Sequence, residues 1–310
     1  MGYNLNDHFW IVTDDLFMRP SYRISPFDTS CIYKNSIIPK ECKCDQFFRR
    51  KHPDYELNYV LKARDGIYQS LTDVALQSSD IVTILSTTQN LYISSCVTNA
   101  VERVCQWNRE ILPETKAIIV VHEFGTVYKD MDSIYSLGVP VIEDFAHSFN
   151  STSAYSGKGD YIIYSFPKYF PIQYGGVVLS KNKIKENNNL SCERYNYIRH
   201  VLSQHIDNID SYKIRRIENY NYLKGNLEKL NFFERLSFKE YETPAVFMFS
   251  VSEHIHLHAL KEYMQNHGVE SSVFYGENAF FIPVHHRLNR IDLDYFIFIL
   301  ESFINKNQRV

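Results

Sequence analysis

Four short and almost entirely apolar segments follow one another through the middle of this chain. Runs of this kind are typical of strands that are buried on both faces of a sheet. Segments with apolar residues at helical spacing precede or separate them, at residues 64–77, 98–107 and 131–137. These four predicted strands are residues 117–124, 139–145, 161–166 and 176–180, and a further short strand is expected at residues 80–86. Strands that alternate with helices predict the α/β class, with helices on both faces of a central, mostly parallel sheet.

The pattern changes in the second half of the chain, where a long polar helix is expected over residues 206–230. We expect a large α/β domain over residues 51–220 and a smaller C-terminal α+β domain over residues 221–310. Residues 1–50 show no clear period and are expected to form an arm or a set of edge elements. The 310 residues of the chain are enough for one large domain and one small domain.

Composition and charge exclude several classes of function. The formal net charge is −3, which gives no electrostatic basis for binding nucleic acid. The N-terminus lacks the pattern of a signal peptide, and no apolar run approaches the length of a membrane-spanning helix. The six cysteines show no disulfide or metal-site spacing. We therefore expect a cytoplasmic protein with free thiols, no metal site and no membrane or nucleic-acid partner.

An acid and a lysine stand at the ends of two predicted strands. Asp144 ends the segment 139–145, and Lys168 follows the segment 161–166. In open α/β sheets, ligands bind at the carboxyl ends of the strands. Pyridoxal phosphate (PLP) requires a lysine that forms a Schiff base with its aldehyde and an acid that keeps its pyridine nitrogen protonated. The alternatives are a surface acid or helix cap for Asp144 and a solvated lysine for Lys168.

Other residues are candidates for the surroundings of such a cofactor. Ser165 and the helix that begins at Asp65 and Gly66 are candidate phosphate ligands, because a helix N-terminus offers free N–H groups. Asp65 is also a good N-cap, and that role does not exclude the other. His122 ends the segment AIIVVH at the expected ligand edge and is a candidate pocket residue.

The arrangement as a whole resembles the DegT/DnrJ/EryC1/StrS family of sugar aminotransferases, which have the aspartate aminotransferase fold (PLP fold type I). The resemblance rests on the order and spacing of several motifs. These are ARDGI at residues 63–67, KAIIVVHEFG at 116–125, KDMD at 129–132, VPVIEDFAHS at 139–148, and Lys168 with Gly175-Gly176. It runs from about residue 60 to 180 and resumes in patches from about 213 to 304.

The resemblance implies a role for four residues around the cofactor ring. Lys168 would hold PLP covalently and then move the proton during transfer. Asp144 would pair with the pyridine nitrogen, and His147 would lie near the ring and orient it. An aromatic residue from the segment 91–95 would stack on the ring, and Tyr92 is the aromatic residue there.

The resemblance also implies contacts to the phosphate and to the substrate. Ser165, with the backbone of Asp65 and Gly66, would hold the phosphate. His122 and His285 are candidate substrate contacts. Two departures from the family pattern stand out: Lys168 follows Ser165 more closely than in the common form, and the segments after the Gly-Gly strand are shortened.

The expected function is therefore a PLP-dependent aminotransferase. It would transfer an amino group from an amino acid, glutamate in the first instance, to the keto group of a nucleotide-linked sugar. The family resemblance implies a homodimer and a place in polysaccharide biosynthesis or the synthesis of another glycosylated product. Three alternatives remain open. They are another PLP-dependent reaction on the same fold, such as elimination or desulfuration, a truncated relative without catalytic activity, and an unrelated α/β protein in which Asp144 and Lys168 are coincidental.

Overall fold

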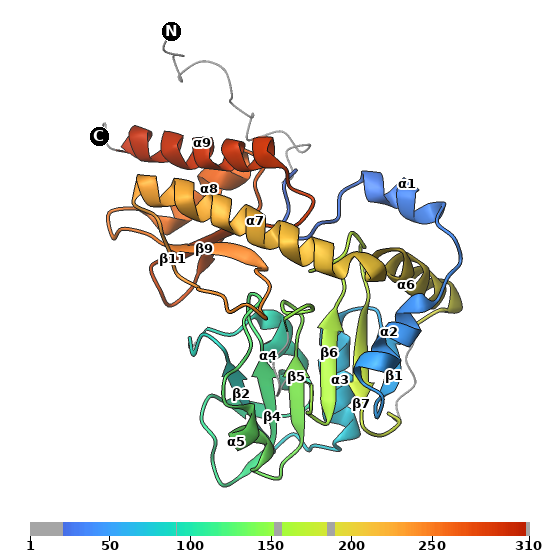
Figure 1. The fold of residues 1–310 in the computed structure, drawn as a ribbon. Helices are drawn as coiled ribbons and strands as arrows, with labels where there is room; N and C mark the ends of the chain where they lie inside the picture. The colour runs from blue at the N-terminus through green and yellow to red at the C-terminus, as the bar shows by residue number, and fades with distance from the viewer. Residues whose placement is uncertain (1–20, 91, 152–156, 185–189, 308–310) are drawn as a thin grey trace. The chain divides into compact units, whose positions relative to one another are not determined.

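A seven-stranded sheet forms the centre of the larger of two units in the computed structural model (Figure 1). The structure describes residues 21–90, 92–151, 157–184 and 190–307. The larger unit comprises Thr29–Asp210 and Phe238–Thr243, and the smaller unit comprises Ser211–Ser237, Pro244–Val310 and Met1–Asp28 within the described ranges. The change of unit falls inside one long helix, ten residues before the boundary predicted at residue 220.

The sheet of the larger unit has the strand order β1-β7-β6-β5-β4-β2-β3. Strands β2, β3, β4, β5 and β6 pair in parallel, whereas β7 runs antiparallel to both β1 and β6. The strands are β1 (Glu56–Val60), β2 (Ile81–Ser86), β3 (Gln106–Asn108), β4 (Thr115–Val121), β5 (Val141–Asp144), β6 (Tyr161–Ser165) and β7 (Gly176–Ser180). The mostly parallel sheet predicted from the sequence is confirmed.

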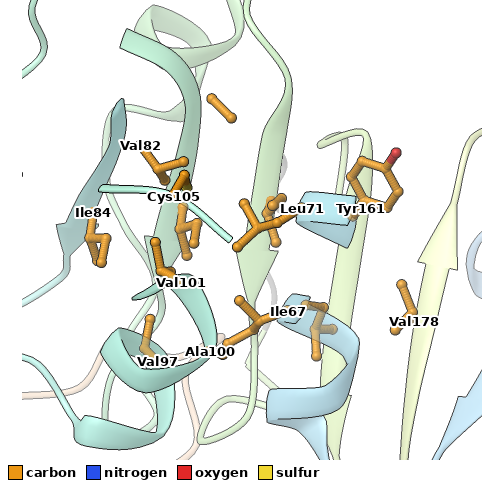
Figure 2. Close-up of a cluster of buried hydrophobic side chains, with 14 of the residues drawn as sticks. Ile67, Leu71, Val82, Ile84, Val97, Ala100, Val101, Cys105, Tyr161 and Val178 are labelled. Atoms are coloured by element: carbon orange, nitrogen blue, oxygen red, sulfur yellow. The ribbon is translucent and has the colours of Figure 1, made fainter. Parts of the chain in front are cut away.

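Helices cover both faces of this sheet. The helices of the larger unit are α1 (Ser30–Ser36), α2 (Lys43–Lys51), α3 (Ala63–Asp73), α4 (Ser95–Glu102), α5 (Met131–Tyr135) and α6 (Cys192–His205). Side chains of α3 and α4 pack with those of β2, β6 and β7 in one apolar cluster, which Figure 2 shows around Ile67, Leu71 and Val101. On the opposite face, Met131 and Ile134 of α5 pack against β4 and β5.

Helix α3 lies unusually close to the sheet because a glycine faces it. A Cβ atom added at Gly66 would lie 2.6 Å from Cγ2 of Val178, which is closer than real Cβ contacts. The helix begins at Ala63, one residue earlier than predicted, so Asp65 is its third residue and not its N-cap. The Asp65 carboxylate reaches back and accepts a hydrogen bond from the backbone N–H of Lys62 (3.1 Å), as in a capping box.

The smaller unit combines helices with a four-stranded antiparallel sheet of order β10-β11-β9-β8. Its elements are α7 (Ile209–Leu227, from Ser211 on), β8 (Phe233–Glu234), β9 (Val246–Ser250), α8 (Leu257–Asn266), β10 (Ser272–Phe274), β11 (Ala279–Pro283) and α9 (Arg290–Asn307). The N-terminal segment joins this unit, since Tyr22 bridges to Val269 and its ring contacts Phe296. The prediction that the C-terminal part of the chain has a smaller α+β structure is confirmed.

Candidate active site

Asp144 ends β5, and its buried carboxylate receives one hydrogen bond among the described residues. The side chain is 4% exposed. It lies two residues after Ile142, so it points to the face that α3 and α4 cover. Its Oδ1 accepts a hydrogen bond from the backbone N–H of Ala146 (2.8 Å), and among the described residues no hydrogen bond reaches Oδ2. Burial raises the pKa of Asp144 to about 6, although the Ala146 N–H and the charge of Lys168 act in the opposite direction.

Lys168 lies in the turn that follows β6. The backbone N–H groups of Tyr169 and Phe170 both donate to the carbonyl of Phe166, at 3.0 and 2.8 Å, which closes the turn around Lys168. The amine of Lys168 is within electrostatic reach of Asp144, because its charge lowers the pKa of that carboxyl. The side chain is exposed, whereas the three aromatic neighbours are buried.

Ser165 lies beside the N-terminus of α3. Ser165 pairs with Gly176 across the antiparallel β6–β7 ladder. A Cβ atom at Gly176 would lie 2.6 Å from the Tyr164 carbonyl oxygen and 3.4 Å from the backbone nitrogen of Ala63. The glycine thus allows the first turn of α3 to approach the end of β6, which brings a hydroxyl and a helix N-terminus together.

The Asp65 N–H does not have the role that the sequence suggested for it. It donates to the carbonyl of Lys62 (2.9 Å). The backbone group that approaches Gly176 is instead the N–H of Ala63. Gly66 packs against the sheet at Val178, and this close packing is what sets the position of the helix start. An anion near Ser165 would therefore meet the beginning of α3 at Ala63.

His147 and Tyr92 both lie on loops at the carboxyl edge of the sheet. His147 is half-buried in the loop after β5, and its ring makes an edge contact with Phe124 at 5.3 Å. Tyr92 is 44% exposed, and its backbone N–H donates to Oδ1 of Asn90 (2.8 Å). The predicted stacking segment begins at Leu91, which lies outside the described residues, and continues through Tyr92 to a buried Ile93.

The structure corrects the prediction that His122 contacts the substrate. It follows Ile118 and Val120 in alternation, so it points to the α5 face of the sheet, opposite to Asp144. Its side chain is fully buried. Both ring nitrogens are engaged: Nδ1 accepts from the Tyr128 N–H (3.1 Å), and Nε2 lies 3.3 Å from Oε2 of Glu143. A ring held in this way is a structural group, and its position contradicts a direct contact with substrate.

His285 also has a setting that argues against substrate contact. It belongs to the smaller unit and is 6% exposed. Its Nδ1 accepts from the backbone N–H of Arg287 (3.2 Å). Burial, together with the charges of Arg216 and Arg287, lowers its pKa to about 3. The ring is therefore a neutral residue of the interior of this unit, and the predicted role is corrected.

The sequence analysis missed Glu143, the residue before Asp144. Glu143 is completely buried on the α5 face. Its oxygens accept hydrogen bonds from Tyr135 Oη (2.8 Å), the N–H of Gly159 (2.7 Å) and the N–H of Gly157 (3.2 Å), in addition to the contact with His122. Burial alone would raise its pKa, but these hydrogen bonds outweigh it and the net shift is downward. One signal was available in the sequence. Successive side chains of a strand point to opposite faces of the sheet, so Glu143 and Asp144 must lie on different faces.

The mostly parallel seven-stranded sheet and the smaller antiparallel sheet match the fold of the fold type I PLP-dependent aminotransferases. Three solved structures are similar to this chain. The aminotransferase TlmJ from Streptoalloteichus hindustanus has 13% identity and a TM-score of 0.69, and the match covers 89% of this chain and 95% of that one. The sugar aminotransferase CalS13 from Micromonospora echinospora has 13% identity, a TM-score of 0.65 and coverage of 92% and 99%. A DegT DnrJ EryC1 StrS aminotransferase from Brucella abortus has 14% identity, a TM-score of 0.64 and coverage of 88% and 93%.

Residues 101–193 match the model of the DegT/DnrJ/EryC1/StrS aminotransferase family. This segment contains Asp144, His147, Ser165 and Lys168. The resemblance predicted from the sequence is confirmed, and with it, at the level of the family, a PLP-dependent transferase. A search of curated proteins gave no match.

The described part of the chain contains no helix that is both long and apolar enough to cross a membrane. All six cysteines are free thiols, as the sequence predicted.

Proposed function

We propose that this protein is a sugar aminotransferase that binds PLP between Asp144 and Lys168. The amino group would come from an amino acid such as glutamate, and the acceptor would be the keto group of a nucleotide-linked sugar. The family match over residues 101–193 supports the reaction class, and the similarity to the sugar aminotransferase CalS13 supports the choice of a sugar.

The observation that carries the proposal is the Asp144 carboxylate at the end of β5, which receives one hydrogen bond among the described residues, from the Ala146 N–H to Oδ1. Burial raises the pKa of this carboxyl, so a cation that binds at Oδ2 would stabilise its charged form. The protonated pyridine nitrogen of PLP is a cation with one N–H donor, so it matches both the charge and the hydrogen-bonding capacity of Oδ2. The Asp144 carboxylate therefore fits the ring end of the cofactor.

The other end of the cofactor fits Ser165 and the start of α3. A phosphate there would accept from the Ser165 hydroxyl and would lie at the positive end of the helix at Ala63. Asp144 and Ser165 lie on the same face of neighbouring strands, because Asp144 pairs with Ile163. The residues proposed for the ring and for the phosphate are thus on neighbouring strands of the same face, which supports the proposal.

Lys168 would hold the cofactor and move the proton. When bound, PLP supplies an electron sink that stabilises negative charge on the substrate carbon. The Nζ of Lys168 would take the proton from that carbon and deliver it to the aldehyde-derived carbon of the cofactor on the other side of the amino nitrogen, as a positioned general base. His147 would orient the ring from the loop after β5, and Tyr92 would cover it.

We also propose a cytoplasmic homodimer that acts in polysaccharide biosynthesis or in the synthesis of another glycosylated product. Exposed apolar side chains on and beside α1, at Ile32 (53%), Tyr33 (70%) and Ile37 (64%), support a partner surface there. Sedimentation of the purified protein would measure the oligomeric state. A monomer at micromolar concentration would contradict the homodimer.

The test of the function begins with the purified protein and PLP. We expect a visible absorption band, and a borohydride-reduced adduct that peptide mapping assigns to Lys168. Glutamate should then bleach the band with release of the corresponding keto acid, and a keto sugar linked to a nucleotide should restore it. Release of ammonia without formation of an amino sugar would indicate elimination. Absence of any band would indicate a relative without the cofactor.

A further inference from the structure

We infer that His122 is the positioning residue of Asp144, although its side chain lies on the opposite face of the sheet. The inference rests on the proposed function, because it concerns the carboxylate proposed to bind the ring nitrogen. His122 directly follows β4 (Thr115–Val121), and β4 pairs in parallel with β5, with Val121 opposite Asp144. One histidine contacts the residue before Asp144, the residue after it and the backbone of Asp144 itself.

The contact to the preceding residue is polar. His122 Nδ1 accepts from the Tyr128 N–H, so the ring proton is on Nε2, which faces Oε2 of Glu143 at 3.3 Å. Both side chains are fully buried. Glu143 is fixed from its other oxygen as well, by Tyr135 and Gly159. The side chain that precedes Asp144 therefore has one permitted position.

The contact to the following residue is a ring stack. The rings of His122 and Phe145 lie 3.9 Å apart between centroids, at an interplanar angle of 23°. Phe145 is 1% exposed, and its backbone N–H donates to the carbonyl of Ile163 on β6 (2.8 Å). The face of the imidazole thus holds Phe145 while its edge holds Glu143.

The backbone of His122 completes the arrangement. Its N–H donates to the carbonyl of Asp144 (2.9 Å), and its carbonyl accepts from the Ser148 hydroxyl (2.7 Å). These two bonds bracket the segment that contains both Asp144 and His147. With both neighbours and the main chain fixed, the Asp144 carboxylate has little freedom to move away from a ring bound on the α3 face. A displacement of about 1 Å at such a site is enough to cost two orders of magnitude in rate.

The experiment compares His122→Phe, which keeps the stack on Phe145 but loses the donor to Glu143, with His122→Gln, which keeps a donor but loses the stack. Each is loaded with PLP, and the pH midpoint of the visible band is titrated alongside kcat and KM for the amino donor. We expect kcat to fall about 10- to 100-fold with a smaller change in KM, and the midpoint to shift. His122→Gln should retain more of the wild-type behaviour than His122→Phe.

Two controls separate positioning from general destabilisation. Tyr161→Phe removes a partly buried hydrogen bond to Asp73 (2.7 Å) at the end of β6 away from Ser165. This variant should lower stability without shifting the visible band. In the Asp144→Asn background, His122→Phe should have no further effect on the midpoint, because its influence passes through Asp144.

The outcomes are distinct. An unshifted midpoint in both His122 variants, or equal effects of His122→Phe in the wild-type and Asp144→Asn backgrounds, would overturn the inference and leave the proposed function intact. A wild-type protein that forms no visible band with PLP would sink the proposed function, and the inference with it.

Discussion

Two adjacent carboxylates at the end of β5 have opposite surroundings. Glu143 faces α5, where four donors surround its two oxygens and the net effect is a lowered pKa. Asp144 faces α3, where the Ala146 N–H is its one hydrogen-bond donor among the described residues and burial raises its pKa to about 6. Both are buried, so exposure does not distinguish them.

The difference separates a structural acid from a functional one. A buried charge that is saturated with donors stabilises the fold in which those donors are arranged. A buried charge that lacks a donor destabilises the same fold until a ligand supplies one. Glu143 is the first kind. Asp144 has a single donor among the described residues, and under the proposed function the ring nitrogen of PLP is the second, which would place the chemistry on the α3 face.

The largest effect should come from the lysine on that face. Lys168→Ala should abolish the borohydride-trapped adduct and lower the transamination rate by about 10³-fold or more, since both the attachment and the proton transfer are lost. The matched control is Lys181→Arg, in an exposed ion pair with Asp160 (3.1 Å), which should leave both unchanged. An adduct that persists at another lysine in Lys168→Ala would break the assignment of the chemistry to this face.

Neutralising each carboxylate in turn should give opposite results. Asp144→Asn should lower kcat by about 10²-fold or more, because the partner of the ring nitrogen loses its charge. It should not lower stability, because burial disfavours that charge in the folded protein. Glu143→Gln should cost about 3 kcal/mol of unfolding free energy, because it disrupts a saturated buried cluster. Urea unfolding and steady-state kinetics on both variants provide the comparison. Equal losses of stability in the two variants would contradict it.

The pH dependence of stability should differ in sign between the two acids. The raised pKa of Asp144 contributes stability that is complete below its unfolded value of about 3.9 and is lost as pH rises through about 6. The lowered pKa of Glu143 contributes stability that is present above its unfolded value of about 4.3 and is lost as pH falls below it. In the protein without PLP, Asp144→Asn should therefore be more stable than wild type at neutral pH by about 1–3 kcal/mol. Urea unfolding of both proteins at several pH values would measure this difference in unfolding free energy. A variant no more stable than wild type at neutral pH would contradict the prediction.

The smallest effect should come from the phosphate end. Ser165→Ala should weaken PLP binding about 10-fold, which is the loss of one hydrogen bond to a charged group, with little change in the visible band. Ser180→Ala removes a hydroxyl that donates to the Asn182 carbonyl (2.6 Å) at the other end of the β6–β7 ladder and serves as the control. Equal PLP affinities of the two variants would move the phosphate site away from Ser165.

The inner strands of the central sheet, β2 and β4 to β7, could be predicted from the sequence because they are mostly buried and therefore read as apolar runs. The outer strands β1 and β3 are partly exposed and were not predicted. The strand predicted at residues 176–180 coincides with β7, and the others differ from the observed strands by a few residues at their ends. Helices α1 and α2 were missed because their apolar residues are few; in α2, Cys44 and Phe48 are the buried pair. The positions of Asp144 and Lys168 at strand ends followed from the same pattern.

The roles of the histidines could not be predicted, because they depend on contacts between strands. Alternation along β4 places His122 with Ile118 and Val120, but its meeting with Glu143 requires the register of β4 against β5. For the same reason, the approach of Ala63 to Gly176 depends on how α3 packs on the sheet. A sequence pattern shows which face a residue takes but not what lies opposite to it.

The central claim is that the open oxygen of Asp144 receives the ring nitrogen of PLP. Nitrogen NMR of the protein loaded with PLP that is isotopically labelled at the ring nitrogen tests this directly. The account predicts a protonated nitrogen in the wild type and in Glu143→Gln, and an unprotonated one in Asp144→Asn. An unprotonated nitrogen in the wild type, or a nitrogen that stays protonated in Asp144→Asn, would contradict it.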